Sequence, residues 1–188
     1  MQFISERYRQ RAATVAWLLF TLTVTPARAI NSDYSNCRHD DRYILGNHET
    51  VTRLDQHSVR LTSLIDSGST ISSMDAHDID VKTHTNGSRW VYFNVPNTNE
   101  NHDVMIKMVK PLVRYAWIQT HSGKPQKRPV IRATIQLGPL TLPTEFSLIR
   151  RSPFKERLLL GKNTLEGVAL IDIGGENLLS KNCELVSR

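Results

Sequence analysis

Hydrophobic and polar residues alternate along much of this 188-residue chain, in short runs separated by turn residues. The clearest run is 130–137, where Ile131, Ala133, Ile135 and Leu137 alternate with polar side chains. Alternation with a period of two is typical of a strand that buries one face. Similar runs occupy 59–65, 89–95, 104–108, 115–118, 140–149 and 168–173. Short strands at this spacing predict an all-β barrel or sandwich, with helix limited to about one short piece.

Two hairpins are predicted between these strands. Asn86-Gly87 separates two strand-like runs and is the strongest short hairpin signal in the chain. The second hairpin has a polar tip at 120–125, between the runs at 115–118 and 130–137. Either hairpin could cover a peptide-binding cleft, and the sequence does not choose between them.

The first 29 residues have the features of an export signal. Arginines within residues 7–11 precede an apolar stretch, 12–25, which is too short for a comfortable membrane span. Small residues follow, and cleavage is expected after Ala29. Residues 1–29 are therefore predicted to be a signal peptide, with an uncleaved anchor as the alternative. The expected localisation is periplasmic or secreted.

Charge adds little to this picture. The formal net charge of the whole chain is +6, and removal of residues 1–29 leaves about +3. A charge this small does not argue for nucleic acid as a partner. The one basic cluster, Lys124, Lys127, Arg128 and Arg132, is interpreted as a solvated loop and strand face rather than an anion site.

After the signal peptide the chain has the length of one domain, about 160 residues. Residues 30–50 are polar and are predicted to form an N-terminal arm, 51–180 carry the strand pattern, and 181–188 form a tail. The only two cysteines, Cys37 and Cys183, lie near the two ends. In an exported protein they favour a disulfide within the chain, with a bond between subunits or two free thiols as the alternatives.

Candidate chemistry begins where the run 59–65 ends, at Leu64-Ile65-Asp66-Ser67-Gly68-Ser69-Thr70. A buried strand carries Asp66 to the edge of the core, and Gly68 permits a sharp turn. A half-buried carboxylate at such a turn can share one proton with a second carboxylate and activate a water between them. On its own, the acid-hydroxyl-glycine tripeptide is more often a strand-end turn in which the aspartate caps the backbone.

A second informative stretch follows much later, at Leu158-Leu159-Leu160-Gly161-Lys162-Asn163-Thr164-Leu165. Three consecutive leucines are typical of a strand buried on both faces, and Gly161 permits another backbone to approach closely. By itself this stretch is typical of an ordinary core strand. A small β chain that has both stretches, an early acid-hydroxyl-glycine turn and a later apolar-apolar-glycine stretch, is a more specific signal than either stretch alone.

The two stretches resemble those of the retropepsin-like aspartic peptidases, and most closely those of a bacterial family labelled ATP-dependent zinc proteases. The resemblance covers about 52–179. The family's first motif reads Asp-Thr-Gly-Ala-x-Thr-Ser-Ala-Leu-His-Ala, and residues 66–76 read Asp-Ser-Gly-Ser-Thr-Ile-Ser-Ser-Met-Asp-Ala. Further family motifs match 89–93 (Arg-Trp-Val-x-Phe), 128–138 (Arg-x-Val-Ile-Arg-x-Thr-x-x-Leu-Gly) and 159–165 (Leu-Leu-Gly-Arg-x-x-Leu). The resemblance implies a retropepsin-like closed β-barrel with one short helix, and aspartic endopeptidase activity.

The resemblance also implies which residues form the site. The expected catalytic turn is Asp66, Ser67 and Gly68, with support from Ser69, Thr70, Leu160 and Gly161. Ser69 stands where the family has alanine, and a hydroxyl there binds the catalytic carboxylate, which predicts a more acidic pH optimum. Asp75 replaces the family's histidine, so any metal role of that histidine is in doubt here.

No metal, ATP or other cofactor is expected, despite the family's label. The sequence has no His-Glu-x-x-His zinc motif and no phosphate-binding loop, and an exported compartment offers no ATP. A serine nucleophile at Ser67 or Ser69 would lack the Gly-x-Ser-x-Gly turn that presents such a residue.

One chain offers one good acid turn, so a homodimer is expected to bring two Asp66 carboxylates together on its two-fold axis. Asp172, in Leu-Ile-Asp-Ile-Gly, is the alternative second acid within the chain. The expected partner is a peptide or protein substrate that lies extended across the cleft. The alternative function is a catalytically inactive, peptide-binding module of the cell envelope.

Overall fold

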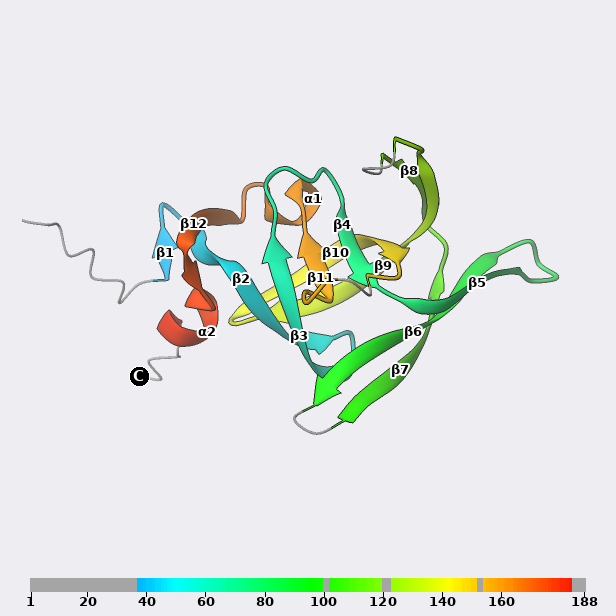
Figure 1. Ribbon diagram of the computed structural model, residues 1–188, viewed down its shortest axis with the longest axis horizontal. Coiled ribbons are helices and arrows are strands. Elements are labelled where there is room, and N and C mark those ends of the chain that lie inside the picture. The colour runs from blue at the N-terminus through cyan, green and yellow to red at the C-terminus, as the bar shows by residue number, and fades with distance from the viewer. Residues whose placement is uncertain (1–36, 100–101, 120–122, 152–153, 184–188) are drawn as a thin grey trace, which may run out of the picture. The chain divides into compact units, whose positions relative to one another are not determined.

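The computed structural model describes most of the chain that follows the predicted signal peptide, as strands with two short helices (Figure 1). The described residues are 37–99, 102–119, 123–151 and 154–183. They belong to one compact unit, residues 33–188. The predicted signal peptide lies outside the described residues. The all-β class predicted from the alternating pattern is confirmed.

The larger sheet closes on itself. Its strands are β1 (Arg38–His39), β2 (Arg42–Leu54), β3 (His57–Ile65), β4 (Ser72–Asp75), β8 (Arg114–Ile118), β9 (Gln126–Leu137), β10 (Leu140–Ile149), β11 (Leu158–Leu160) and β12 (Ala169–Glu176). They pair in the order β1-β2-β3-β11-β4-β10-β9-β8, and β12 pairs with β2. A further pairing of β2 with β9 joins β2, β3, β11, β4, β10 and β9 into a ring. A closed ring leaves few unpaired strand edges.

The short strand β11 determines where the candidate site forms. It lies between β3 and β4, parallel to β3 and antiparallel to β4. Leu158 and Leu160 are fully buried, and burying each leucine side chain contributes roughly 1.5–3 kcal/mol. Because β3 ends at Ile65 and β11 ends at Leu160, the Asp66 turn and Gly161 emerge next to each other.

The second sheet is antiparallel and consists of β5 (His77–Thr83), β6 (Arg89–Asn99) and β7 (His102–Pro111). The predicted hairpin at Asn86-Gly87 joins β5 to β6, and Gly87 has a φ of +81°, which glycine adopts without strain. Val91, Phe93 and Val95 of β6 are buried and belong to the same hydrophobic core as the ring.

The predicted polar arm, residues 30–50, is in its second half a strand. β2 begins at Arg42, and Leu45 is fully buried. The pattern hides this half of β2 because Gly46 interrupts the alternation of side chains. A Cβ at residue 46 would lie 2.5 Å from the backbone oxygen of Gly175, so only glycine fits beside β12 there.

A disulfide and a buried carboxylate hold the two ends of the described chain together. Cys37 and Cys183 are bonded, with Cα atoms 5.4 Å apart, which confirms the predicted disulfide within the chain. Glu49 Oε1 accepts hydrogen bonds from the backbone N–H groups of Gly46, Leu178 and Leu179. Burial raises the pKa of Glu49, while these hydrogen bonds and the charge of Lys181 act in the opposite direction.

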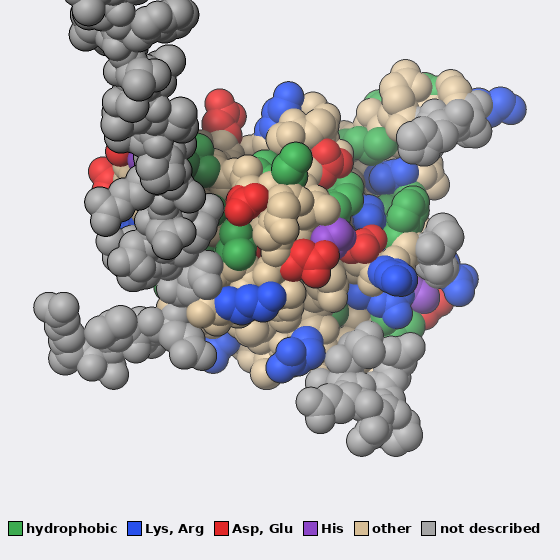
Figure 2. Space-filling model, turned by 60° about the vertical axis from the view of Figure 1, so that its left-hand side comes forward, with side chains coloured by type: hydrophobic (Ala, Val, Ile, Leu, Met, Phe, Trp, Pro, Cys, Tyr) green, Lys and Arg blue, Asp and Glu red, His purple; other side chains and the backbone are tan. Residues whose placement is uncertain are grey.

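In the described ranges, helix is limited to α1 (Lys162–Leu165) and α2 (Leu178–Asn182), one more than predicted. Among the described residues, no helix has the length and hydropathy needed to cross a membrane. Figure 2 shows acidic and basic side chains interspersed on the face in view, in keeping with the small net charge.

Candidate active site

The Asp66 turn holds its own carboxylate in place. Asp66 is half-buried directly after β3, and its backbone N–H donates to Leu160 O at 2.9 Å. The Gly68 N–H donates to Asp66 Oδ1 at 2.8 Å, and Ser69 Oγ–H donates to Oδ2 at 2.9 Å. Both oxygens of the carboxylate therefore have a donor from within the turn. These two hydrogen bonds fix the orientation of the carboxylate at the end of β3.

The Gly161 turn supports the Asp66 turn from the other side. Lys162 N–H donates to Ser69 O at 2.8 Å, and Asn163 N–H donates to Thr70 O at 3.2 Å. A Cβ at Gly161 would lie 2.7 Å from Ser69 O, so a larger residue would push the two turns apart. Leu160 and Gly161, which the sequence suggests as supporting residues, thus lie directly beside the Asp66 turn.

Ser72 links the two turns, and the sequence analysis missed it. Its Oγ accepts a hydrogen bond from Gly161 N–H at 3.0 Å and lies 2.8 Å from Asn163 Oδ1 and 2.7 Å from Thr164 Oγ1. Ser72 N–H also donates to Asn163 Oδ1 at 2.8 Å. Ser72, Asn163 and Thr164 all lie within the two motifs, so the motifs contain the signal. Their mutual contacts depend on β11 lying beside β4.

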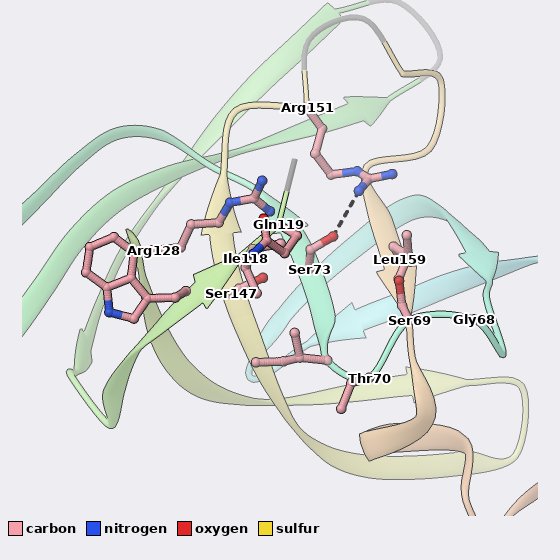
Figure 3. Close-up of a pocket in the computed structure, with 12 residues that line it drawn as sticks. Gly68, Ser69, Thr70, Ser73, Ile118, Gln119, Arg128, Ser147, Arg151 and Leu159 are labelled. Atoms are coloured by element: carbon pink, nitrogen blue, oxygen red, sulfur yellow. Dashed lines mark hydrogen bonds between the residues drawn. The ribbon is translucent and has the colours of Figure 1, made fainter. Parts of the chain in front are cut away.

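A pocket of about 440 Å³ adjoins the Asp66 turn (Figure 3). Ser69 and Thr70 line it from the turn, and Trp117 and Gln119 line it from the hairpin formed by β8 and β9. Trp117 is 68% exposed at the mouth of the pocket. The Asn86-Gly87 hairpin contributes no residue to the lining. Of the two hairpins considered as covers, the β8–β9 hairpin is therefore the one beside the turn.

Two arginines enter this pocket, Arg128 from β9 and Arg151 from the connection between β10 and β11. Arg151 is only 7% exposed; its Nε donates to Glu156 O at 3.0 Å and its Nη1 donates to Ser73 Oγ at 2.9 Å. Arg128 Nε donates to Gln126 Oε1 at 3.0 Å. Within the described part of the chain, both guanidinium groups thus bind neutral oxygens, and neither forms an ion pair with a carboxylate.

The charges of these arginines are partly desolvated. Burial lowers the pKa of Arg151, while the charges of Glu156, Asp75 and Asp66 act in the opposite direction. Burial lowers the pKa of Arg128 as well, and the positive charge of Arg151 adds to the effect. Arginine nevertheless remains protonated in proteins. Two desolvated positive charges without a paired carboxylate favour a negatively charged ligand.

The interpretation of the basic cluster as a solvated face is therefore wrong for one member. Lys124, Lys127 and Arg132 are exposed, as predicted. Arg128 is half-buried and lines the pocket, at a position of β9 that pairs with the buried Ala116 of β8. Arg151 gave no signal in the sequence, since it lies in a polar connection outside every motif.

Other candidate groups do not line the pocket. Asp172, the alternative second acid, lies in β12, where its Oδ1 accepts a hydrogen bond from Gly174 N–H at 2.9 Å, and it does not line the pocket. Ser67 is exposed at the turn. Across the described ranges, no three His, Cys, Asp or Glu side chains are grouped so that they could hold a metal ion.

A closed ring of strands, with an aspartate turn braced by an apolar strand and a glycine, defines the retropepsin-like class of aspartic peptidase folds. The chain belongs to the RimB-like family, described as the retropepsin-like aspartic endopeptidase RimB, and the family model matches residues 44–182. The resemblance to retropepsin-like peptidases is thereby confirmed at the level of the family. The zinc-protease label is not part of this family's description.

Relatives and a solved structure add two further likenesses. A probable alpha-L-glutamate ligase from Parasynechococcus marenigrum is 31% identical over 115 residues, which is 61% of this chain and 24% of the relative. One from Shewanella pealeana is 25% identical over 134 residues, 71% of this chain and 29% of the relative. The chain thus matches less than a third of either protein's length.

The crystal structure of Lpg0085 from Legionella pneumophila, a protein of unknown function, superposes with a TM-score of 0.59. The two chains are 24% identical, and the likeness covers 71% of this chain and 95% of the other. At this identity, the likeness supports the fold alone.

Proposed function

We propose that this chain is an aspartic endopeptidase that hydrolyses peptide bonds with a water held between two Asp66 carboxylates, one from each subunit of a homodimer. The observation that carries this proposal is the Asp66 turn, whose carboxylate is held by Gly68 and Ser69 next to a pocket. Membership of a family described as retropepsin-like aspartic endopeptidases supports the same chemistry.

The need for a second carboxylate supports the homodimer. Within the described residues, no aspartate or glutamate lines the pocket itself, and the turn beside it carries a single carboxylate, that of Asp66. Ser67, Gly68 and Thr70 are exposed, so the turn is accessible to a second copy of the chain. In Figure 1 the connection between β3 and β4 lies along the same side as α1 and β8. A two-fold axis along this side would bring two Asp66 turns together.

The two carboxylates would divide the chemistry between them. Two adjacent carboxylates cannot both ionise readily, so they share one proton. The ionised Asp66 takes a proton from the water as the water oxygen attacks the carbonyl carbon of the peptide. The protonated Asp66 donates to the carbonyl oxygen, and a proton then passes to the leaving amine as the C–N bond breaks. The β8–β9 hairpin would cover the extended peptide during these steps.

The pocket lined by Arg128 and Arg151, called the arginine pocket from here on, favours substrates with an acidic side chain near the scissile bond. A carboxylate that enters between Arg128 and Arg151 would neutralise two partly buried charges. The relatives' name, glutamate ligase, supports glutamyl peptides in particular. We do not extend the ligase activity to this chain, because the match covers 24% and 29% of those proteins and the sequence has no phosphate-binding loop.

The location of this activity is also a proposal. The basic, apolar and small-residue order of residues 1–29 supports export to the periplasm or beyond. The disulfide between Cys37 and Cys183 agrees with an oxidising compartment.

A cleavage assay tests the proposed function. The purified exported chain is incubated with an unstructured protein mixture from about pH 3 to 7, with Asp66→Asn as the matched control. We expect cleavage by the wild type, inhibition by a pepstatin-type compound, no effect of a chelator, and no cleavage by the folded variant. Cleavage by Asp66→Asn, or loss of wild-type activity with chelator, would contradict the proposal.

The alternative is a peptide-binding module without catalysis. It is favoured by one observation, that the described part of a single chain supplies a binding pocket but only one aspartate turn beside it. Tight binding of peptides that are never cleaved, by a protein that stays monomeric at high concentration, would support this alternative.

A further inference from the structure

Arg151 is held in the pocket by two residues of the neighbouring strand β4. Its Nη1 donates to Ser73 Oγ at 2.9 Å, as the dashed line in Figure 3 shows. Its backbone N–H donates to Asp75 Oδ1 at 2.7 Å. Ser73 is 6% exposed and Asp75 is fully buried. One residue of β4 therefore orients the guanidinium, and another fixes the backbone that carries it.

Asp75 also fixes the far end of the connection that carries Arg151. Asp75 Oδ2 accepts a hydrogen bond from Arg157 Nη1 at 2.8 Å, and the Asp75 N–H donates to Arg157 O at 2.7 Å. His77 Nε2 lies 3.5 Å from Asp75 Oδ1. Arg151 Nε closes the arrangement by donating to Glu156 O at 3.0 Å. A single buried carboxylate thus ties residues 151 and 157 to the same point of β4.

We propose that Ser73 and Asp75 are positioning residues that set the selectivity of the pocket for acidic side chains by fixing Arg151. This inference rests on the proposed function and concerns substrate selection, not the chemical step. Both residues lie in the short stretch 66–76, whereas Arg151 lies in the connection between β10 and β11.

The contacts explain why fixing Arg151 would increase selectivity. Within the described residues, Nε and Nη1 are used by the protein and Nη2 has no hydrogen-bond partner. The Nη2 N–H groups can therefore bind a substrate carboxylate. A guanidinium already held in its bound orientation loses less conformational freedom when the ligand binds. Without the hydrogen bond to Ser73, the guanidinium keeps only its Nε bond to Glu156 O and its contact with the Phe154 ring, so ligand binding would have to restrict it further.

The test compares two peptides that differ only by glutamate or glutamine near the cleaved bond. Kinetics are measured for wild type, Ser73→Ala and Asp75→Asn, with Arg132→Gln as a control that removes an exposed arginine of β9. For Ser73→Ala and Asp75→Asn, we expect the KM for the glutamate peptide to rise about tenfold, as for a lost hydrogen bond to a charged group. We expect kcat to stay within about twofold and the preference for glutamate to fall. Arg132→Gln should keep the wild-type preference.

The same two peptides are also titrated against Asp66→Asn protein, with and without Ser73→Ala. This binding measurement tests the positioning role even if wild type cleaves nothing, in which case the proposed function alone fails. An unchanged ratio of glutamate to glutamine affinity on Ser73→Ala would overturn the inference, as would a wild type with no preference. A loss of kcat at constant KM would also overturn it, because it would indicate damage to the Asp66 turn. If Asp75→Asn does not fold, Ser73→Ala decides the question.

Discussion

The Asp66 turn and the arginine pocket lie side by side, but the chain builds them in different ways. Both donors to the Asp66 carboxylate come from the next three residues along the chain, Gly68 and Ser69. Arg151 depends instead on Ser73 and Asp75. These residues lie 78 and 76 positions away from it in the sequence. The turn can therefore be recognised in a short motif, whereas the pocket exists only once the ring has closed.

This difference separates the proposed chemistry from the proposed selectivity. Changes within the Asp66 turn, or in the Gly161 turn that supports it, are expected to affect kcat, because they act on the carboxylate or on the turns that hold it. Changes around the arginines are expected to affect KM and the choice between substrates, because they act on a ligand's charge. Each prediction below tests whether the two regions separate in this way.

The largest effect is expected for Asp66→Asn. The amide keeps the shape of the side chain but cannot act as a base, so kcat should fall by about a thousandfold or more. Peptide affinity and the unfolding midpoint should change little. Initial rates, titration with an uncleaved peptide and urea unfolding measure the three quantities. Asp172→Asn is the matched control and should keep full activity; a comparable loss in that variant would make Asp172 the second acid.

Gly161→Ala should combine a loss of activity with a loss of stability. The new Cβ would lie 2.7 Å from Ser69 O, and relief of such a contact typically costs about 1–3 kcal/mol of unfolding free energy. Displacement of the Asp66 turn should also lower kcat by about tenfold or more. Urea unfolding and initial rates measure both effects.

Gly174→Ala is the control for Gly161→Ala, because its Cβ would meet only Asp172 Oδ1 at an ordinary 3.4 Å. Equal effects of the two substitutions would argue against a special role for the contact between the turns.

Arg128→Gln should weaken the recognition of acidic substrates. The substitution removes one of two positive charges in the pocket, so the KM for a glutamate peptide should rise about tenfold while kcat is retained. Steady-state kinetics with the glutamate and glutamine peptides measure the effect. Lys127→Gln, at an exposed neighbouring position, removes the same charge outside the pocket. If both variants lose the preference equally, the net charge of the protein, and not the pocket, selects the substrate.

Ser69→Ala should lower the rate without abolishing it. The Ser69 hydroxyl donates to Asp66 Oδ2, so its removal leaves that oxygen without a donor from the turn and the carboxylate less firmly oriented. We expect kcat to fall severalfold while KM changes little. Initial rates of Ser69→Ala and wild type measure the effect, and an unchanged kcat would show that this hydrogen bond does not hold the carboxylate for catalysis.

The smallest effect concerns stability, and it lies outside both regions. Burial raises the pKa of Glu49, so between its unfolded and folded pKa values the folded protein keeps a proton that the unfolded chain releases. Stability should therefore decrease as pH rises through that interval. Glu49→Gln keeps an acceptor oxygen for the backbone N–H groups of Gly46, Leu178 and Leu179 and should remove this decrease. Urea unfolding of both proteins across the interval measures it, and parallel pH curves would contradict the prediction.

The sequence predicts the fold and the Asp66 turn well, because both depend on local patterns. The alternation along 130–137 corresponds to β9 with buried Ile131 and Ile135, and Asn86-Gly87 forms its hairpin. The three leucines at 158–160 form β11 beside the turn. The first half of β2 was missed because Gly46 breaks the alternation that identifies a strand.

The pocket could not be predicted, for a physical reason. Arg128 resembles its exposed neighbours in the sequence, and it lines a pocket only because the fold brings the Asp66 turn and Arg151 close to β9. Arg151 lies in a connection with no periodic pattern, and its partners, Ser73 and Asp75, lie on another strand. Long-range contacts of this kind leave no trace in the local order of residue types.

Mixing active and inactive subunits tests the shared site most directly. Wild type and Asp66→Asn, carrying different affinity tags, are unfolded, mixed in varied ratios and refolded together, so that any dimers form at random. If each site needs two Asp66 carboxylates, activity should follow the square of the wild-type fraction, and an equal mixture should keep about a quarter of the activity. Activity proportional to the wild-type fraction itself, about half in the equal mixture, would show that one chain is sufficient and would contradict the account.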